Sequence, residues 1–265
     1  MNRSIRSLLG QRVRHAAFGL CILIGALVVL ETIVKFFHIS SYLLPPPTTI
    51  FYKLFENWGT IAPHLMVTTV EALTGFLLAT VIAICLAVCC LWFPTLEKLI
   101  LPMAVILQTV PVIVLAPVLV ITLGNGIASK VVIAALIAFF PTFINAARGL
   151  VSIETPHLEL FQTLNANRWQ TLLKLRVPTA LPYLFASLRI AAANCYIGAV
   201  IGEWVSASKG IGYLAQVYLY QINIDLLYAT VLTSSFAALA FAYAIGLVET
   251  LMCPWSRESL GTQRP

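Results

Sequence analysis

The chain has 265 residues, of which 60% are hydrophobic and only 10% are charged. Soluble domains carry about 25% charged and about 45–50% apolar residues, so this composition argues against a soluble globular protein and also against a disordered chain. The net charge of +6 does not indicate nucleic acid, because basic residues in an apolar chain can mark the cytoplasmic side of a membrane.

Six stretches are apolar enough to cross a bilayer as helices, since a span needs about 20 mostly apolar residues. They are Ala16–Phe37, His64–Phe93, Leu99–Leu123, Lys130–Leu150, Val177–Val205 and Leu226–Cys253. With both termini inside, the outer segments hold four of the 16 basic residues, namely Lys35, Lys53, Lys130 and Lys209, and the inner segments hold the rest. The positive-inside rule therefore predicts an all-α integral membrane protein with cytoplasmic termini, 1–15 and 254–265.

Two outer segments carry recognisable patterns. In 38–63, three prolines from Pro45 to Pro47 favour an extended backbone. Residues Thr48–Trp58 then predict an amphipathic helix on the outer surface, with contact to an external partner as the alternative. In the segment after Val205, Gly210 and Gly212 permit a sharp turn before an interfacial helix.

The inner segment 151–176 predicts two short helices. Thr155 caps the first, which Pro156 begins and Asn165 closes, because Asn tolerates a left-handed conformation. The pair Asn167 and Gln170 predicts a capping box for the second helix, which Pro178 disrupts. Two short helices joined by a tight turn make a compact protrusion on the cytoplasmic side, which is suited to contact a cytoplasmic partner.

Several polar groups and prolines within the spans are candidates for a translocation pathway. Prolines interrupt the third and fourth spans, and broken helices are tolerated where a cavity or other protein covers them. The candidates are Gln108, Thr109, Pro111, Thr142, Asn145 and Asn194, with ordinary helix–helix hydrogen bonds and kinks as the alternative. Glu203 lies near the outer end of the fifth span, where a gate or a structural partner such as Lys209 is expected.

Small residues recur at four-residue spacing, which lets membrane helices approach closely. They are Gly75, Ala79, Ala83 and Ala87 in the second span and Gly198 and Gly202 in the fifth. Packing within one subunit and packing between subunits both fit this pattern. The six cysteines fit neither metal-ligand spacing nor a nucleophile–base arrangement, so we expect no metal site and no enzyme.

The inner segment also resembles the cytoplasmic loop of binding-protein-dependent ABC importer permeases, Glu-Ala-Ala-x3-Gly-x9-Ile-x-Leu-Pro. Glu159 begins the pattern, Asn165 takes the glycine place, and Pro178 ends it, with the spacing intact. Leu160 and Phe161 replace the two alanines and are bulkier. Other matching stretches in order are Leu43–Pro47, Gly75–Leu78, Gln108–Pro111, Leu115–Pro117, Leu181–Pro182, Leu188–Arg189, Gly202–Trp204 and Gly210–Tyr213.

Together these stretches resemble the nitrate/sulfonate/taurine/bicarbonate branch of the family, which includes importers of thiamine-precursor pyrimidines and riboflavin. Glu71, where many sulfonate-type members have Arg, favours the pyrimidine and riboflavin subgroup. The resemblance implies a type I importer permease with six membrane helices, N-in and C-in, in the bacterial inner membrane. It also implies ATPase coupling through Glu159, Leu160, Phe161, Leu164, Asn165, Ala166 and Pro178.

The implied partners are a second permease copy, two cytoplasmic ATPase subunits, a periplasmic or lipid-anchored binding protein and membrane lipid, but no nucleic acid. The chain has no Gly-x4-Gly-Lys-Ser/Thr phosphate loop, so ATP and Mg²⁺ are expected only in the partner ATPase and no cofactor on this chain. The solute is expected to be a sulfonate or taurine, nitrate or bicarbonate, or a pyrimidine or flavin. A stand-alone secondary transporter is the main alternative, and a membrane-embedded enzyme a weaker one.

Overall fold

The computed structural model describes residues 18–19, 21–22 and 24–255. The expected N-terminal segment 1–15, and all but the first two residues of the C-terminal segment 254–265, lie outside the described residues. The chain forms two compact units, one of 1–60 with 215–231 and the other of 61–214 with 232–265. Each unit is described by itself below, and the described residues contain helices and no strand.

Most of the larger unit consists of long apolar helices. They are α3 (Trp58–Trp92), α4 (Pro94–Leu107), α5 (Val112–Leu123), α6 (Ile127–Val151), α9 (Val177–Val205) and α11 (Ile224–Met252), of which α3 and α11 extend into the smaller unit. Among the described residues, four helices are long and apolar enough to cross a membrane, and α4 with α5 would make a fifth. The first predicted span lies partly outside these residues, so the count of six spans stays a prediction.

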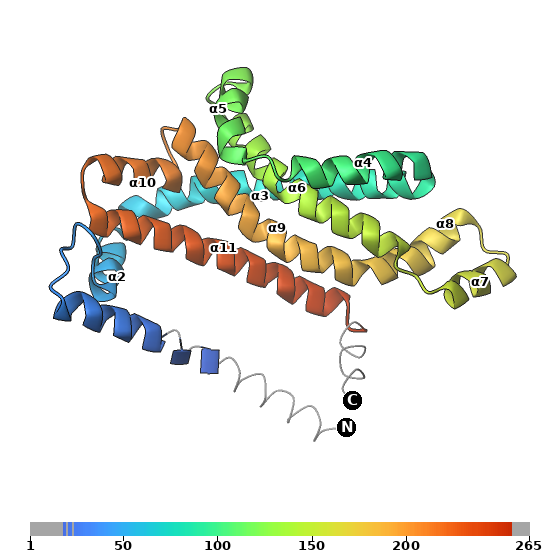
Figure 1. Cartoon of the computed structure of the whole chain (residues 1–265), viewed down its shortest axis with the longest axis horizontal. Coiled ribbons are helices and arrows are strands. Elements are labelled where there is room, and N and C mark those ends of the chain that lie inside the picture. Colours follow the sequence, from blue (N-terminus) through green and yellow to red (C-terminus); the bar gives the residue numbers. More distant parts are fainter. Residues whose placement is uncertain (1–17, 20, 23, 256–265) are drawn as a thin grey trace. The chain divides into compact units, whose positions relative to one another are not determined.

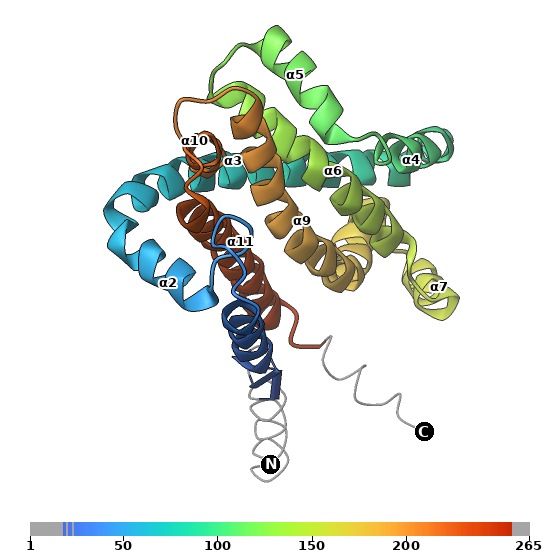
Figure 2. The ribbon, with the colours of Figure 1, turned by 60° about the vertical axis from the view of Figure 1, so that its left-hand side comes forward.

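The third predicted span is a bent pair of helices. A single helix over Leu99–Leu123 was expected to be interrupted by three prolines, but only Pro111 ends it, and the axes of α4 and α5 differ by 101°. The residue before a proline is disfavoured in the helical conformation, and the break spans 108–111, between the ends of α4 and α5. Figures 1 and 2 both show α5 turning away from α4. Pro141 does not interrupt α6, which continues through it because a proline removes only one helical hydrogen bond.

Helix α6 lies at the centre of the larger unit, with α9 beside it in both views (Figures 1 and 2). Ala134 of α6 meets a glycine on each side. A Cβ atom built on Gly75 of α3 would lie 2.7 Å from the Ala134 Cβ, and one on Gly198 of α9 would lie 2.6 Å from the Ala134 Cα. Membrane helices associate mainly through such close packing, because moving an apolar side chain from lipid to a helix contact gains little hydrophobic free energy. These two glycines therefore pack within one subunit.

The remaining small residues of α3, Ala79, Ala83 and Ala87, are also buried. They belong to two hydrophobic clusters, one with Phe185 and Leu188 of α9 and one with Phe143 and Leu150 of α6. Gly202 faces Lys130, whose Cγ would lie 3.1 Å from an added Cβ atom. All six small residues predicted for helix packing thus lie inside the larger unit.

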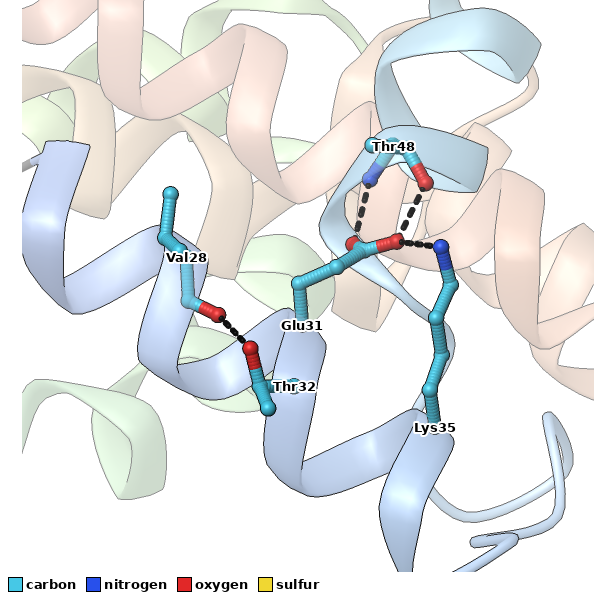
Figure 3. Close-up of polar contacts among 5 residues, drawn as sticks. All are labelled: Val28, Glu31, Thr32, Lys35 and Thr48. Carbon is cyan, nitrogen blue, oxygen red and sulfur yellow. Dashed lines mark hydrogen bonds and ion pairs between the residues drawn. The ribbon is translucent and has the colours of Figure 1, made fainter.

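The smaller unit contains α2 (Pro47–Glu56), which follows the three prolines as the sequence predicts. Leu54 is buried while Tyr52 and Phe55 are exposed, so the helix is amphipathic. Its first turn is held by Glu31, on the preceding helix. The Glu31 carboxylate accepts hydrogen bonds from the Thr48 N–H at 3.1 Å and the Thr48 hydroxyl at 2.8 Å, and pairs with Lys35 at 2.6 Å (Figure 3).

Candidate translocation cavity and coupling segment

A cavity of about 250 Å³ lies at the break between α4 and α5, against α6 and α9. Two of the polar residues predicted for the pathway, Gln108 and Asn194, line it, although they are 86 positions apart in the sequence. The other lining residues are apolar: Leu107, Val110, Val112, Leu136, Ile137, Phe140 and Pro141. Two side-chain amides therefore face one apolar cavity, where each can donate and accept hydrogen bonds.

The structure does not bring the other polar candidates to this cavity. The hydroxyl of Thr142 donates to the Ala138 carbonyl at 2.8 Å, and the Asn145 amide donates to the Pro141 carbonyl at 2.8 Å. Thr109 donates to the carbonyl of Ile106 at 2.7 Å. These bonds lie within a helix or its terminal turn and not between helices; that these three residues line the pathway stays a prediction. Pro111 caps α5 and thereby positions the break that opens the cavity.

Glu203 lies near the C-terminal end of α9, in a buried polar cluster. Its carboxylate accepts from the Thr68 hydroxyl and from the Gly212 N–H, both at 2.6 Å. A side chain at Gly210, where φ is 111°, would overlap this carboxylate. Glu203 is 0% exposed and its partners lie on α3 and at the start of α10 (Ile211–Tyr220). Glu203 and Lys209 form no ion pair among the described residues, and the structural partners of Glu203 are instead Thr68 and the turn between α9 and α10; a gate role stays a prediction.

The same cluster holds residues that sequence reasoning missed. Glu71 of α3 and Lys130 of α6 are both buried and act electrostatically on Glu203. The Lys130 ammonium donates to the Asn125 side chain at 2.8 Å. On α3, His64 and Thr68 lie one turn apart and accept from the N–H groups of Gly210 and Ile211. The sequence offers one signal for this cluster. The ionisable residues Glu71, Lys130 and Glu203 lie within apolar runs, where charged side chains are rare and energetically costly.

The coupling segment consists of α7 (Thr155–Thr163), α8 (Arg168–Thr171) and a π-helical turn over Leu172–Arg176. As predicted, Asn165 closes α7 with φ of 54°. The N–H of Ala166 donates to the Phe161 carbonyl and the N–H of Asn165 to the Gln162 carbonyl, the two bonds of a Schellman motif. The capping box of α8 is also confirmed, because Asn167 and Gln170 exchange side-chain bonds at 2.8 and 2.9 Å.

Two predictions for this segment were wrong. The N-cap of α7 is Glu154, without a side-chain bond, and Thr155 is the first helical residue. Pro178 does not end the second helix, since α8, the π-helical turn and α9 form one span from Arg168 to Val205. A π-helical turn pairs each N–H with the carbonyl five residues earlier. The π-helical turn ends two residues before Pro178. The hydrogen bond that proline cannot form therefore falls where the helix changes from π to α.

Helix α7 presents two different faces. Leu160 and Leu164 are 54% and 68% exposed, and their four-residue separation places them on one side of the helix. Leu158 and Phe161 are half-buried, and Leu158 lines a cleft together with Leu91 and Trp92 of α3. Figure 1 shows α7 and α8 beyond the end of α6, where α8 leads into α9. An exposed apolar ridge therefore lies on a short helix outside the long apolar spans.

Residues 75–252 match the family described as the binding-protein-dependent transport system inner membrane component. The chain belongs to this family. It is 34% identical to the formylaminopyrimidine transport permease protein ThiX of Halalkalibacterium halodurans over 83% of this chain and 88% of that protein. It is 32% identical to the riboflavin transport system permease protein RibX of Chloroflexus aurantiacus, over 95% and 94% of the two chains.

More distant relatives show the same type of protein. The taurine transport system permease protein TauC of Escherichia coli is 27% identical over 89% of this chain and 90% of its own length. The inward-facing structure of the MetNI methionine ABC transporter matches with a TM-score of 0.50 at 21% identity, covering 74% of this chain and 97% of that chain. These findings confirm the expected resemblance and the all-α type I importer permease fold of this membrane protein.

Proposed function

We propose that this permease forms the translocation path for a small neutral heterocyclic solute and couples it to ATP hydrolysis through α7. The proposed assembly contains a second copy of the chain, two cytoplasmic ATPase subunits and an external binding protein, in a bacterial inner membrane. Both termini and the coupling segment face the cytoplasm in this proposal, as the distribution of Lys and Arg favours. ATP and Mg²⁺ belong to the ATPase subunits.

The exposed leucine ridge of α7 is the observation that carries the coupling role. An exposed apolar patch on a helix outside the apolar spans is typical of a protein contact. Leu160 and Leu164 project away from the unit, while the Schellman motif at Asn165 fixes the end of the helix. Leu158, on the other face of α7, lines a cleft together with Leu91 and Trp92 of α3, so we propose that movement of the ridge is passed to α3 and, through α8, to α9.

The cavity supports the choice of solute. No charged side chain is present among the described residues that line it, whereas a sulfonate or nitrate anion would need a cation nearby. The amides of Gln108 and Asn194 match the ring nitrogens and carbonyls of a pyrimidine or flavin, which carry donors and acceptors in one plane. The names of two relatives, formylaminopyrimidine and riboflavin permeases, agree with this choice.

The coupling role is tested with Leu160→Glu in the assembled transporter, with ATP hydrolysis measured with and without loaded binding protein. We expect the stimulated rate to fall to the basal rate, because a charge on the ridge prevents burial against the ATPase. Leu173→Glu is the matched control, since Leu173 is 61% exposed outside α7, and it should retain stimulation. Full stimulation in Leu160→Glu would refute coupling through this face. So would solute uptake by the chain alone, driven by an ion gradient.

The solute path is tested separately with Asn194→Ala, which removes one amide from the cavity. A hydrogen bond to an uncharged group contributes about 0.5–1.5 kcal/mol, so we expect the KM for uptake to rise several-fold to about tenfold. Asn145→Ala is the control, because that amide bonds within α6 and lies outside the cavity. The ligand carried by the copurified binding protein identifies the solute, and an anionic ligand would contradict the proposed class.

A further inference from the structure

A second, larger cleft of about 510 Å³ lies between the end of α3 and the coupling segment. One part of its lining is polar and comes from α7, α8 and the π-helical turn: Gln162, Arg168, Thr171 and Arg176. The other part is apolar and includes Leu91 of α3 and Leu172. The cleft is therefore amphiphilic, with its polar groups on the side of α7, α8 and the π-helical turn.

The charge in this cleft is all of one sign. Arg168 and Arg176 line it, and none of the described lining residues is acidic. Neither arginine takes part in the ion pairs found among the described residues. One nitrogen of Arg176 donates to the Leu150 carbonyl at 2.8 Å, which fixes the guanidinium and leaves its other donors available. Two guanidinium groups with no carboxylate partner are suited to bind a phosphate group.

The position of the cleft indicates where such a phosphate comes from. Trp92 at the end of the apolar helix α3 packs edge-to-face against Trp169 of α8, with ring centroids 4.5 Å apart. Tryptophan is enriched at the level of lipid headgroups, so this pair marks a membrane boundary. The adjacent surface of α3 is lipophilic, and Leu91 and Leu172 continue it into the cleft.

We propose that this cleft binds the phosphate headgroup of an anionic phospholipid from the cytoplasmic leaflet. The two arginines contact the phosphate, and the acyl chains leave along the apolar end of α3. Basic clefts between membrane helices on the cytoplasmic side recognise anionic headgroups in this way. The assignment to the cytoplasmic leaflet rests on the orientation in the proposed function. A bound lipid would link α3 to α7 and α8 and so stabilise the coupling segment against the membrane helices.

The test measures lipid retention by the purified full-length permease with native mass spectrometry. The probes are dioctanoyl phosphatidylglycerol, dioctanoyl phosphatidylcholine and inorganic phosphate, each titrated separately. We expect at least tenfold tighter retention of phosphatidylglycerol than of the other two probes, because only it offers both an anionic headgroup and acyl chains. Arg168→Gln with Arg176→Gln should abolish this preference. Lys174→Gln removes one charge from an exposed neighbouring side chain outside the cleft, as Arg168→Gln does inside it, and should preserve the preference.

Arg168→Gln alone guards against misfolding, because Arg168 is exposed while Arg176 supports the Leu150 carbonyl. It should weaken phosphatidylglycerol retention several-fold in a protein with an unchanged thermal unfolding midpoint. Equal retention of the two lipids by the unaltered chain would overturn the proposal, as would an equal loss in Lys174→Gln. Inorganic phosphate binding as tightly as phosphatidylglycerol would overturn the lipid assignment. Lipid retention needs no ATPase subunit, so its failure is distinguishable from a failure of the coupling proposal.

Discussion

The close approach of α6 and α9 makes Gly198→Ala the most informative perturbation of the fold. A Cβ atom at position 198 would lie 2.6 Å from the Ala134 Cα and 3.1 Å from both the Ala134 nitrogen and the Ile133 carbonyl oxygen. All three are backbone atoms, so no flexible side chain can move away. Carbon atoms pack at about 3.5–4.0 Å, so the two helices must separate locally by about 1 Å.

We expect this separation to lower the free energy of unfolding by about 1–3 kcal/mol, the usual cost of an extra methyl group in a packed core. The measurement is the unfolding midpoint in mixed detergent micelles titrated with sodium dodecyl sulfate. Gly59→Ala is the matched control, because Gly59 also lies in a helix and nothing would lie within 4 Å of its added Cβ atom. Alanine is favoured over glycine in helix interiors by about 0.8–1.0 kcal/mol; Gly198→Ala receives this gain, and Gly59→Ala, in the first turn of α3, receives less of it.

The difference between the two variants therefore gives a lower limit for the cost of the clash at Ala134. Equal midpoints for Gly198→Ala and Gly59→Ala would show that α6 and α9 are not in close contact and would refute the packing argument. Gly75→Ala offers an independent check on the opposite side of α6, where the added atom would lie 2.7 Å from the Ala134 Cβ. It should destabilise the chain by a similar amount.

Three further substitutions have defined outcomes. Glu203→Ala removes the acceptor of the buried Gly212 N–H, so we expect a loss of about 1–3 kcal/mol in the same titration, while the Thr68 hydroxyl keeps the His64 carbonyl as an acceptor at 3.2 Å. Asn165→Val places a β-branched residue at φ of 54°, at a cost of roughly 1–2 kcal/mol, and should reduce ATPase stimulation by the loaded binding protein. Glu31→Ala removes both acceptors of Thr48, so amide exchange in the first turn of α2 should accelerate.

Each of these three substitutions has its own control. Lys209→Ala, on the turn beside Glu203, should leave stability unchanged, and an equal loss there would contradict the role assigned to the carboxylate. Asn165→Gly should keep ATPase stimulation, because glycine adopts the left-handed conformation without strain; a loss would show that the amide side chain itself is needed. For Glu31→Ala, exchange in the last turn of α2 serves as the internal reference, and uniform acceleration along the helix would contradict the capping role.

Local features were predictable from the sequence because they depend on neighbouring residues. Apolar runs specify membrane helices wherever they occur, since every backbone group in lipid must be bonded within its own segment. The left-handed Asn165 and the capping box of Asn167 and Gln170 likewise depend on a few adjacent residues. The motif spacing from Glu159 to Pro178 was sufficient to indicate the family, which the comparisons confirm.

The side chain environments were not predictable in the same way. Thr142 and Asn145 were expected to face the translocation pathway, as Gln108 and Asn194 were, but their side chains bond to their own helix. A polar side chain in a membrane helix can bond to a backbone carbonyl of its own helix or face a cavity. Which of the two occurs depends on how the helix is rotated about its axis, and neighbouring helices set that rotation. The effect of Pro111 as against Pro141 is equally a matter of packing, because both are compatible with a helix when the freed carbonyl is covered.

By itself, then, the sequence determined an all-helical membrane permease, its family and the local shape of its coupling segment, because hydrophobic length and backbone conformation are properties of short stretches. Only the tertiary structure decided which residues meet: Gln108 with Asn194 in one cavity, Glu203 with α3 and the α9–α10 turn, and Arg168 with Arg176 in one cleft. The physical reason is that apolar helices are nearly uniform along their length, so small residues such as Gly75 and Gly198 set the register.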